Sequence, residues 1–210
     1  MIEHTTNKDE DFSFSDGAIE LLNSLKENLL ITPKEFECNG CRCFYYFEYY
    51  PKRYEVESIY LKYRKVMYDF TNSLLLVEMP TALAQSFDSL NLYNPRESWY
   101  ITKVPGKVDY CSHHIYEFFC ANYSKVSRIQ NGYDLIEVKE MNGLPVSDKI
   151  PLLDRLDFKD ILGKRIILFQ DCYRTGASFT LVSNKLRSLG VREVVGLFVS
   201  KTFWIPDFVL

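Results

Sequence analysis

Apolar residues follow one another without alternation from Ile166 to Phe169 and again from Val194 to Val199. Uninterrupted apolar runs are typical of strands that are buried on both faces of a mostly parallel sheet. Between the two runs, apolar residues recur at the three- and four-residue spacing of an amphipathic helix, which Gly190 ends: Phe179, Val182, Leu186 and Leu189. The order of strand, turn, helix and strand predicts an α/β fold with a central, mostly parallel sheet.

The N-terminal half of the chain predicts helices and one hairpin. The sequence alternates and is rich in aromatic residues from Phe36 to Tyr50 around an Asn39-Gly40 turn, which predicts the hairpin. Apolar spacing predicts one helix that opens at Ser15 and two more over Glu57–Phe70 and Leu74–Leu90. The basic residues of the second helix are expected to face solvent: Lys62, Arg64 and Lys65.

These patterns divide the chain into three parts. Residues 1–14 are charged and lack periodicity, so we expect a flexible N-terminus. Residues 15–95 are expected to form an α+β cap of helices and the aromatic-rich hairpin, and residues 96–210 the α/β core. Within the core, residues 124–160 carry Asn-Gly turns at 131–132 and 142–143, which favour a hairpin or flap. Acidic residues accompany the basic ones there, so the flap is not a basic patch.

Polar residues begin where the first buried strand is expected to end, in the stretch QDCYRTGAS from Gln170 to Ser178. In an open parallel sheet, ligands bind at the carboxyl ends of strands, and a helix N-terminus offers unpaired N–H groups to an anion. Gly176 lets the backbone approach a phosphate closely, and the hydroxyl groups of Thr175 and Ser178 can complete its shell. The stretch therefore predicts a phosphate-binding loop.

This stretch resembles the phosphoribosyl-pyrophosphate loop of type I phosphoribosyltransferases, in which four apolar residues, two acids and three variable residues precede Thr-Gly and a small or hydroxyl pair. The downstream GVREVVGLFVSKTF resembles the strand that closes this unit in the competence-protein-F-like, or amidophosphoribosyltransferase-like, branch. Upstream, Trp99–Lys107 looks like the family's earlier strand with its pyrophosphate-binding loop, followed by a helix over Val108–Tyr123. The resemblance implies the fold of that family, with residues 124–160 as a mobile hood over the active site.

The resemblance also implies roles for single residues. Asp171 and Gln170 would face the ribose hydroxyls, with Mg²⁺ bound through Asp171, and the enzymatic step would displace pyrophosphate at the anomeric carbon. The residues implied at the 5′-phosphate are Thr175, Gly176, Ala177 and Ser178, and Cys172 and Tyr173 are further candidates for ligand binding. Arg174 joins Asp171 and Gln170 as a candidate catalytic residue. Those implied at the pyrophosphate are Val104, Pro105, Gly106 and Lys107.

Two departures from the family pattern bear on the chemistry. The first of the two acids is Gln170 here, and a neutral amide adds no charge to hold a divalent cation. Arg174 stands where purine-salvage members carry an aspartate beside the base. A guanidinium stays protonated, so it cannot serve as a general base, although it can clamp a phosphate. The alternative to an enzyme is therefore a sensor or effector module that binds phosphoribosyl pyrophosphate or a nucleoside monophosphate and controls a protein or nucleic-acid partner.

The six cysteines, in a chain without a signal peptide, point to reduced thiols or to a metal site. Cys38 and Cys41 have the spacing of a zinc-binding pair, Cys43 follows, and the related branch often carries an N-terminal zinc ribbon, which favours a role in DNA uptake or processing. The candidates for a fourth zinc ligand are His4, Cys111, His113 and His114. The alternative is a plain turn between two strands that carry cysteines. We expect the two adjacent histidines to be structural.

Composition restricts the choice further. The chain is 47% hydrophobic and 25% charged, as is usual for a soluble globular protein, and its net charge of −3 argues against a broad nucleic-acid-binding surface. No apolar run reaches the roughly 20 residues that cross a bilayer. The acidic start MIEHTTNKDEDF is not a secretory signal, so a cytoplasmic location without a membrane partner is expected. The apolar tail after Phe203 either completes the core or docks to a second subunit, which allows a homo-oligomer.

Overall fold

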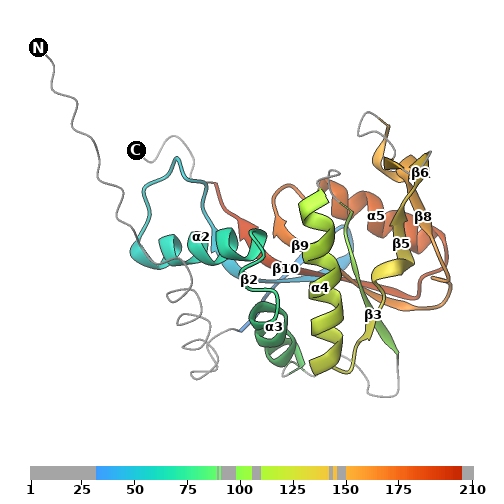
Figure 1. The fold of residues 1–210 in the computed structure, drawn as a ribbon, viewed down its shortest axis with the longest axis horizontal. Coiled ribbons are helices and arrows are strands. Elements are labelled where there is room, and N and C mark those ends of the chain that lie inside the picture. Colours follow the sequence, from blue (N-terminus) through green and yellow to red (C-terminus); the bar gives the residue numbers. More distant parts are fainter. Residues whose placement is uncertain are drawn as a thin grey trace, which may run out of the picture.

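A strand from Arg165 to Tyr173, β9, lies in the middle of a six-stranded sheet of order β1-β2-β10-β9-β3-β4 (Figure 1). The computed structural model describes residues 32–88, 90, 98–105, 110–141, 144–145 and 150–204, with the backbone alone for 110–113, 141 and 144–145. The other strands of this sheet are β1 (Lys34–Cys38), β2 (Cys41–Tyr49), β3 (Trp99–Lys103), β4 (Gln130–Asn131) and β10 (Glu193–Thr202).

The sheet is parallel except at one edge. Strand β9 pairs in parallel with β10 and with β3, β3 pairs in parallel with β4, and only β1 is antiparallel to its neighbour. Both apolar runs noted in the sequence are central strands with side chains buried on both faces, as their lack of alternation predicts. The predicted α/β fold with a mostly parallel central sheet is therefore confirmed.

The aromatic-rich segment forms the predicted hairpin. Asn39 and Gly40 both have positive φ, 53° and 68°, as a two-residue type I′ turn between β1 and β2 requires. The hairpin was expected within an N-terminal cap, whereas β2 pairs in parallel with β10 from Cys43 to Tyr49 and so extends the central sheet. The division of the chain into cap and core stays a prediction.

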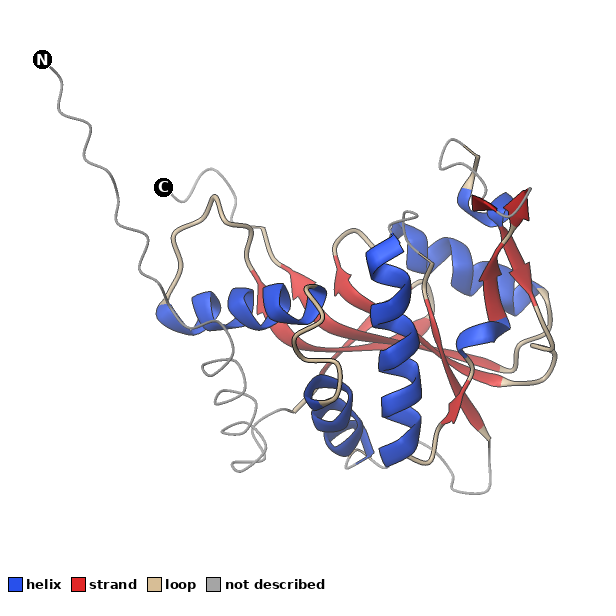
Figure 2. Ribbon diagram, viewed as in Figure 1, coloured by secondary structure: helices blue, strands red, loops and turns tan. Residues whose placement is uncertain are grey.

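Helices cover both faces of the sheet (Figure 2). The helices α2 (Ser58–Thr71), α3 (Glu78–Asp88) and α4 (Tyr110–Val126) pack on one face, and α5 (Ala177–Ser188) packs on the other. All four were predicted, although α3 starts only at Glu78, with Pro80 in its first turn, where a proline is tolerated. The alternate side chains of β9 serve both cores, since Ile167 and Phe169 face α4 while Ile166 and Leu168 face α5.

One residue of α2 departs from the expected solvated basic face. Arg64 donates from Nε to the carbonyl oxygen of Tyr50 at 2.6 Å, and from one terminal nitrogen to those of Pro51 and Tyr54 at 2.8 and 2.9 Å. Its guanidinium thus satisfies the backbone of the segment that leads into α2. Lys62, in contrast, is exposed as predicted.

Residues 136–158, within the predicted flap of 124–160, form short antiparallel pairs: β5 (Ile136–Val138) pairs with β8 (Leu156–Phe158), and β6 (Glu140–Met141) pairs with β7 (Leu144–Pro145). The hairpin turn expected at 131–132 is wrong, because Asn131 ends β4, which pairs in parallel with β3 in the central sheet. The turn predicted at 142–143 lies outside the described residues. Two short 3-10 helices, η1 (Tyr133–Leu135) and η2 (Leu152–Arg155), precede β5 and β8. Expectations for residues 1–31, including the helix that opens at Ser15 and the candidate zinc ligand His4, and for the tail beyond Trp204, lie outside the described residues.

Candidate functional site

The candidate loop joins the carboxyl end of β9 to the N-terminus of α5. Strand β9 extends beyond the apolar run to Tyr173, so Gln170, Asp171 and Cys172 belong to the strand and only residues 174–176 form the turn. The expectation that the strand ends at Phe169 is therefore wrong. Pairing with β10 continues to Tyr173, so the polar residues lie at the carboxyl end of the strand. The position is central in the sheet, where parallel strands place their ligands.

Gly176 is the N-cap residue of α5 and has a φ of 75°. Helical hydrogen bonding starts when the Thr180 N–H donates to the Gly176 carbonyl oxygen at 2.8 Å, so the amides of the first turn have no intrahelical acceptor. The Thr175 hydroxyl accepts a long bond of 3.4 Å from the Ala177 N–H, and no side chain caps the helix. Apart from the Ala177 N–H, the amides of the first turn have no hydrogen-bond partner among the described residues, so they can bind an anion. Thr175 and Ala177 are exposed beside them.

The Tyr173 ring closes one side of this turn. A Cβ atom built on Gly176 would lie 2.8 Å from the ring, which leaves room for glycine alone. The Tyr173 hydroxyl donates to Cys38 Sγ over 3.4 Å, and the ring packs edge-on against Phe36 and Phe198. Burial, and then the bond to Cys38, raise the pKa of Tyr173 to about 12. This side chain belongs to the aromatic packing behind the loop, so only its backbone can serve a phosphate.

Asp171 is held in place from α4. The Tyr116 hydroxyl donates to Asp171 Oδ1 over 3.0 Å. Burial, and then the charge of Asp171, raise the pKa of Tyr116 well above its ordinary value, so the phenol remains a donor. The sequence did not single out Tyr116, because a tyrosine in a helix carries no mark of a carboxylate 55 positions further along the chain.

Two further residues of the site, one near the end of β9 and one in the turn, are open to a ligand. Gln170 is half-buried at the strand end, and its amide makes no hydrogen bond within the described ranges. Arg174 is exposed in the turn and likewise has no partner among the described residues. A free guanidinium beside free helix amides adds positive charge where an anion would bind.

Cys172 belongs to strand β9 and not to the loop predicted from Gln170 to Ser178. Its side chain is buried, and Sγ lies 3.3 Å from the hydroxyl oxygen of Thr202 on β10. The thiol therefore contacts β10 inside the sheet and does not face the loop.

The second predicted loop begins at the end of β3. The Val104 N–H donates to the Phe169 carbonyl oxygen over 2.7 Å, and both Val104 and Pro105 are buried. Gly106 and Lys107 lie outside the described residues. Lys103, at the last position of β3, is only 4% exposed, and its ammonium group lies over the Tyr133 ring. Burial lowers the pKa of Lys103 to about 8, against the opposing influence of Cys120 and nearby acids.

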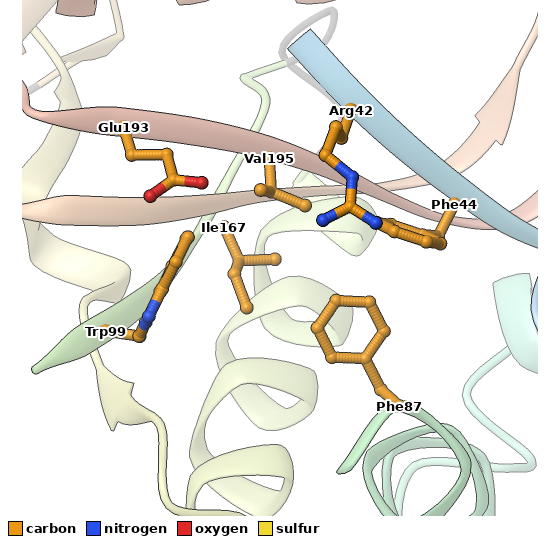
Figure 3. A pocket seen from close by; sticks show the side chains of 7 residues that line it. All are labelled: Arg42, Phe44, Phe87, Trp99, Ile167, Glu193 and Val195. Carbon is orange, nitrogen blue, oxygen red and sulfur yellow. The ribbon is translucent and has the colours of Figure 1, made fainter. Parts of the chain in front are cut away.

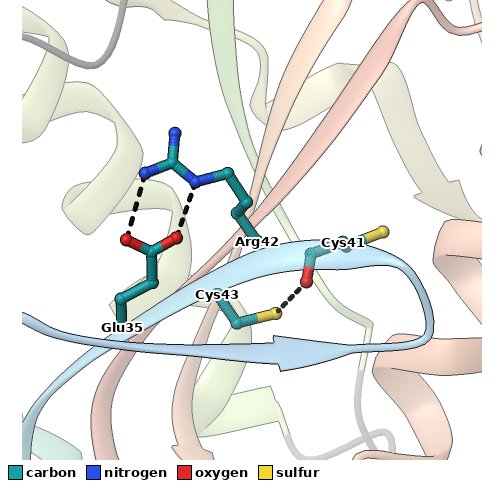
Figure 4. Close-up of polar contacts among 4 residues, drawn as sticks. All are labelled: Glu35, Cys41, Arg42 and Cys43. Carbon is teal, nitrogen blue, oxygen red and sulfur yellow. Dashed lines mark hydrogen bonds and ion pairs between the residues drawn. The ribbon is translucent and has the colours of Figure 1, made fainter.

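The three hairpin cysteines lie around the turn without the arrangement of a metal site. Cys41 and Cys43 are buried, and the Cys43 thiol donates to the Cys41 carbonyl oxygen over 3.6 Å, beside the surface ion pair of Arg42 with Glu35 (Figure 4). Burial raises the pKa of Cys43 to about 12, which disfavours the thiolate that binds zinc. Within the described ranges, no three His, Cys, Asp or Glu side chains are grouped to hold a metal ion. The geometry gives the zinc hypothesis no support.

The remaining chemical candidates belong to α4. His114 is exposed on α4 with its Nδ1 3.9 Å from Glu117, and the side chains of Cys111 and His113 are outside the description. Cys120 is buried in the core, as predicted. Among the described helices, none combines the length and apolar character needed to cross a bilayer.

Two hollows lie at the opposite end of the strands from the candidate loop, near the amino ends of β3 and β10. One is a cavity of about 10 Å³, the space of a single water molecule, and its lining is shown in Figure 3: Arg42, Phe44, Phe87, Trp99, Ile167, Glu193 and Val195. The other, a wider surface hollow of about 380 Å³, shares Arg42, Glu193 and Val195 with it. Neither belongs to the loop at the carboxyl end of β9.

Solved purine phosphoribosyltransferases are similar to this chain in structure. A hypoxanthine-guanine phosphoribosyltransferase from Bacillus anthracis is 14% identical with a TM-score of 0.36, and the match covers 60% of this chain and 66% of that one, slightly under two thirds. A hypoxanthine phosphoribosyltransferase from Staphylococcus aureus is 13% identical with a TM-score of 0.33, covering 67% and 75% of the two chains. The hypoxanthine-guanine phosphoribosyltransferase from Schistosoma mansoni, solved with IMP, is 14% identical with a TM-score of 0.33, covering 75% and 82%.

No family model matches the sequence, and no curated protein matches it. At such identities and TM-scores, the structural likenesses support no statement about function.

Proposed function

We propose that this protein binds phosphoribosyl pyrophosphate or a nucleoside 5′-phosphate at the carboxyl end of β9. The observation that carries the proposal is the uncapped N-terminus of α5, which follows a central parallel strand through Gly176. The first-turn amides, with Thr175, Ala177 and Ser178, would hold the 5′-phosphate. Asp171 and Gln170, at the strand end beside this turn, would meet the ribose hydroxyls. Arg174 would add charge at the phosphate.

Two functional classes are compatible with such binding. As an enzyme, the protein would break the bond between the anomeric carbon and pyrophosphate and join that carbon to an acceptor base, with Asp171 stabilising the cation-like transition state. As a sensor or effector, it would bind the same ligand and change its contact with a protein or nucleic-acid partner. Gln170 in place of a second acid and Arg174 beside the turn favour the sensor. The competence-protein-F-like branch, a cytoplasmic location and a homo-oligomer remain parts of the proposal that rest on the sequence.

Calorimetric titration tests the binding claim. The full chain is titrated with phosphoribosyl pyrophosphate and with a panel of nucleoside 5′-monophosphates, and at least one is expected to bind. Ser178→Asp places a carboxylate at the helix N-terminus, which suits the helix dipole but repels a phosphate, so binding should be lost while the fold remains. Ser178→Ala is the matched control and should weaken binding only slightly. If no ligand gives heat with the wild-type protein, the proposal fails.

Pyrophosphate release distinguishes the two classes. The wild-type protein is incubated with phosphoribosyl pyrophosphate and a panel of nucleobases, and released pyrophosphate is measured. Turnover that Asp171→Ala abolishes would reject the sensor-only alternative. Binding without turnover for any base would support the sensor.

A further inference from the structure

One oxygen of the Asp171 carboxylate is already bound by the protein itself. The Tyr116 hydroxyl donates to Oδ1, and the Tyr116 ring packs edge-on against Phe169 with the ring centroids 5.6 Å apart. Phe169 in turn stacks on Phe119 of α4 at 3.5 Å between centroids. The ring that holds Asp171 is thus itself fixed by packing between helix and strand. Oδ2 is the oxygen that remains for a ligand.

The donors at this strand end do not fit a magnesium ion bound by the protein. Mg²⁺ requires a nearly octahedral shell of oxygen atoms and is usually held by one or two carboxylates together with substrate phosphates. Gln170 contributes only a neutral amide, which adds no charge to hold a divalent cation. A single carboxylate with one oxygen engaged by a phenol is a poor cation site.

Of the residues described at the neighbouring strand end, 103–105, none presents a free charge to a second phosphate group. Lys103 is buried with its ammonium group on the Tyr133 ring, and Val104 and Pro105 are buried next to it. A lysine that is sequestered in this way does not present its charge to a pyrophosphate. The exposed cation of the described site is Arg174, on the side of the 5′-phosphate turn.

From this geometry we infer that the site binds a nucleoside 5′-monophosphate without any divalent cation, and that Asp171 Oδ2 accepts a hydrogen bond directly from a ribose hydroxyl. Tyr116 is the positioning residue that keeps Asp171 in the orientation for this bond. The inference rests on the proposed function and narrows its ligand, since phosphoribosyl pyrophosphate, which carries its cation on the pyrophosphate, would be the weaker partner.

The dependence on metal is measured first. Dissociation constants of the wild-type protein for AMP, GMP, IMP and UMP are compared in the presence of MgCl₂ and in the presence of EDTA. The tightest ligand is expected to keep its dissociation constant in EDTA, and to bind more tightly than phosphoribosyl pyrophosphate in MgCl₂. Loss of monophosphate binding in EDTA, or a preference for phosphoribosyl pyrophosphate, would overturn the inference and leave the proposed function intact.

The role of Tyr116 is tested with a thermodynamic cycle of dissociation constants that combines one substitution in the protein with the removal of one hydroxyl from the ligand. Tyr116→Phe removes the hydroxyl that holds Asp171, and the 2′-deoxy and 3′-deoxy forms of the ligand remove one ribose hydroxyl each. A hydrogen bond to a charged carboxylate is worth roughly a tenfold change in affinity, so the deoxy form that lacks the bonded hydroxyl should bind about tenfold more weakly to the wild type. For the Tyr116→Phe variant, the loss of affinity caused by removing the same ribose hydroxyl should be much smaller.

This reduction in the penalty separates positioning from a purely structural effect. A variant that merely loosened the fold would weaken the ribose and deoxyribose ligands by the same factor. Tyr63→Phe, whose hydroxyl makes no hydrogen bond in the described ranges, is the matched control and should leave the full deoxy penalty in place. Equal affinity of all deoxy forms for the wild type, or an unchanged penalty in Tyr116→Phe, would contradict the inference. Failure of every phosphate ligand to bind would instead remove the proposed function, and the inference with it.

Discussion

The ammonium nitrogen of Lys103 lies 3.3 Å from the centroid of the Tyr133 ring, so the last residue of β3 directs its charge into the face of an aromatic ring of η1. A cation over a ring face is stabilised by the negative potential of the π system. The contact joins the central sheet to the first element of the flap region. It also places a charged group where only 4% of the residue is exposed.

This burial predicts an unusual alkaline response of stability. The pKa of Lys103 is about 8 in the folded protein and 10.5 in its ordinary state, so the unfolded chain binds more protons between these values. Stability therefore rises with pH across that window, by up to about 3 kcal/mol if the shift is complete. Urea unfolding of the wild type and of Lys103→Met, from neutral pH upward, measures the difference between them.

The Lys103→Met variant should be the more stable protein at neutral pH, and its advantage should shrink as the pH approaches 10.5. Lys125→Met changes an exposed lysine of α4 and serves as the control, with no such pH-dependent difference. A constant difference between Lys103→Met and the wild type at all pH values would contradict the low pKa of Lys103.

Gly176 is predicted to be irreplaceable because of the Tyr173 ring and not because of its φ alone. Gly176 and Gly163 have similar φ values, 75° and 70°, but a Cβ on Gly163 would meet nothing within 4 Å. Gly163→Ala should cost about 1 kcal/mol of unfolding free energy for the left-handed backbone. Gly176→Ala should cost about 1–3 kcal/mol more, because the Tyr173 ring must move.

The double variant Gly176→Ala/Tyr173→Ala tests that explanation. Removal of the ring should make the glycine substitution cost no more than it does at Gly163, as a thermodynamic cycle of unfolding free energies will measure. Additive costs in this cycle would show that the ring and the turn are independent.

Asp69 of α2 is predicted to destabilise the protein when it is ionised. Its side chain is fully buried, and neither carboxylate oxygen has a hydrogen-bond partner among the described residues. Burial raises the pKa of Asp69 above its ordinary 3.8, with Lys65 acting weakly in the opposite direction. The folded state therefore holds the proton more tightly than the unfolded state. The loss of unfolding free energy from ionised Asp69 is absent below pH 3.8 and complete above the raised pKa of the folded state.

Asp69→Asn should accordingly be more stable than the wild type at neutral pH, by about 1–3 kcal/mol. That advantage should fade as the pH is lowered towards 3.8, which chemical denaturation over a pH series measures. Asp154→Asn removes an exposed carboxylate and should show no trend of this kind. A variant less stable than the wild type at neutral pH would mean that the Asp69 carboxylate is compensated in the folded state.

Arg64 is predicted to fix the segment between β2 and α2. Its three hydrogen bonds reach the carbonyl groups of Tyr50, Pro51 and Tyr54, a geometry that the planar guanidinium provides and an ammonium group does not. Arg64→Met and Arg64→Lys should both lower the unfolding free energy, the former by about 2 kcal/mol. Both should also speed proteolysis within residues 50–57. Lys62 is an exposed residue of the same helix, and Lys62→Met should change the unfolding free energy by less than about 0.5 kcal/mol.

The sequence by itself determined the elements and their order. The unbroken apolar run at Ile166–Phe169 predicted a doubly buried strand, and the spacing of Phe179, Val182 and Leu186 predicted the helix after it. Asn39-Gly40 predicted the two-residue hairpin turn, and Gly190 the end of α5. Each of these depends on residues within a few positions of one another, and backbone geometry and burial act on such neighbours directly.

Only the tertiary structure decided which distant residues meet. Tyr116 and Asp171 are 55 positions apart, and their bond exists because α4 packs across β9. The parallel pairing of β2 with β10 and the burial of Lys103 under Tyr133 likewise depend on how whole elements pack. Periodicity states which face of an element is apolar but not which other element will cover it. The candidate site depends on that choice, because its carboxylate takes its orientation from a helix that the loop sequence does not contain.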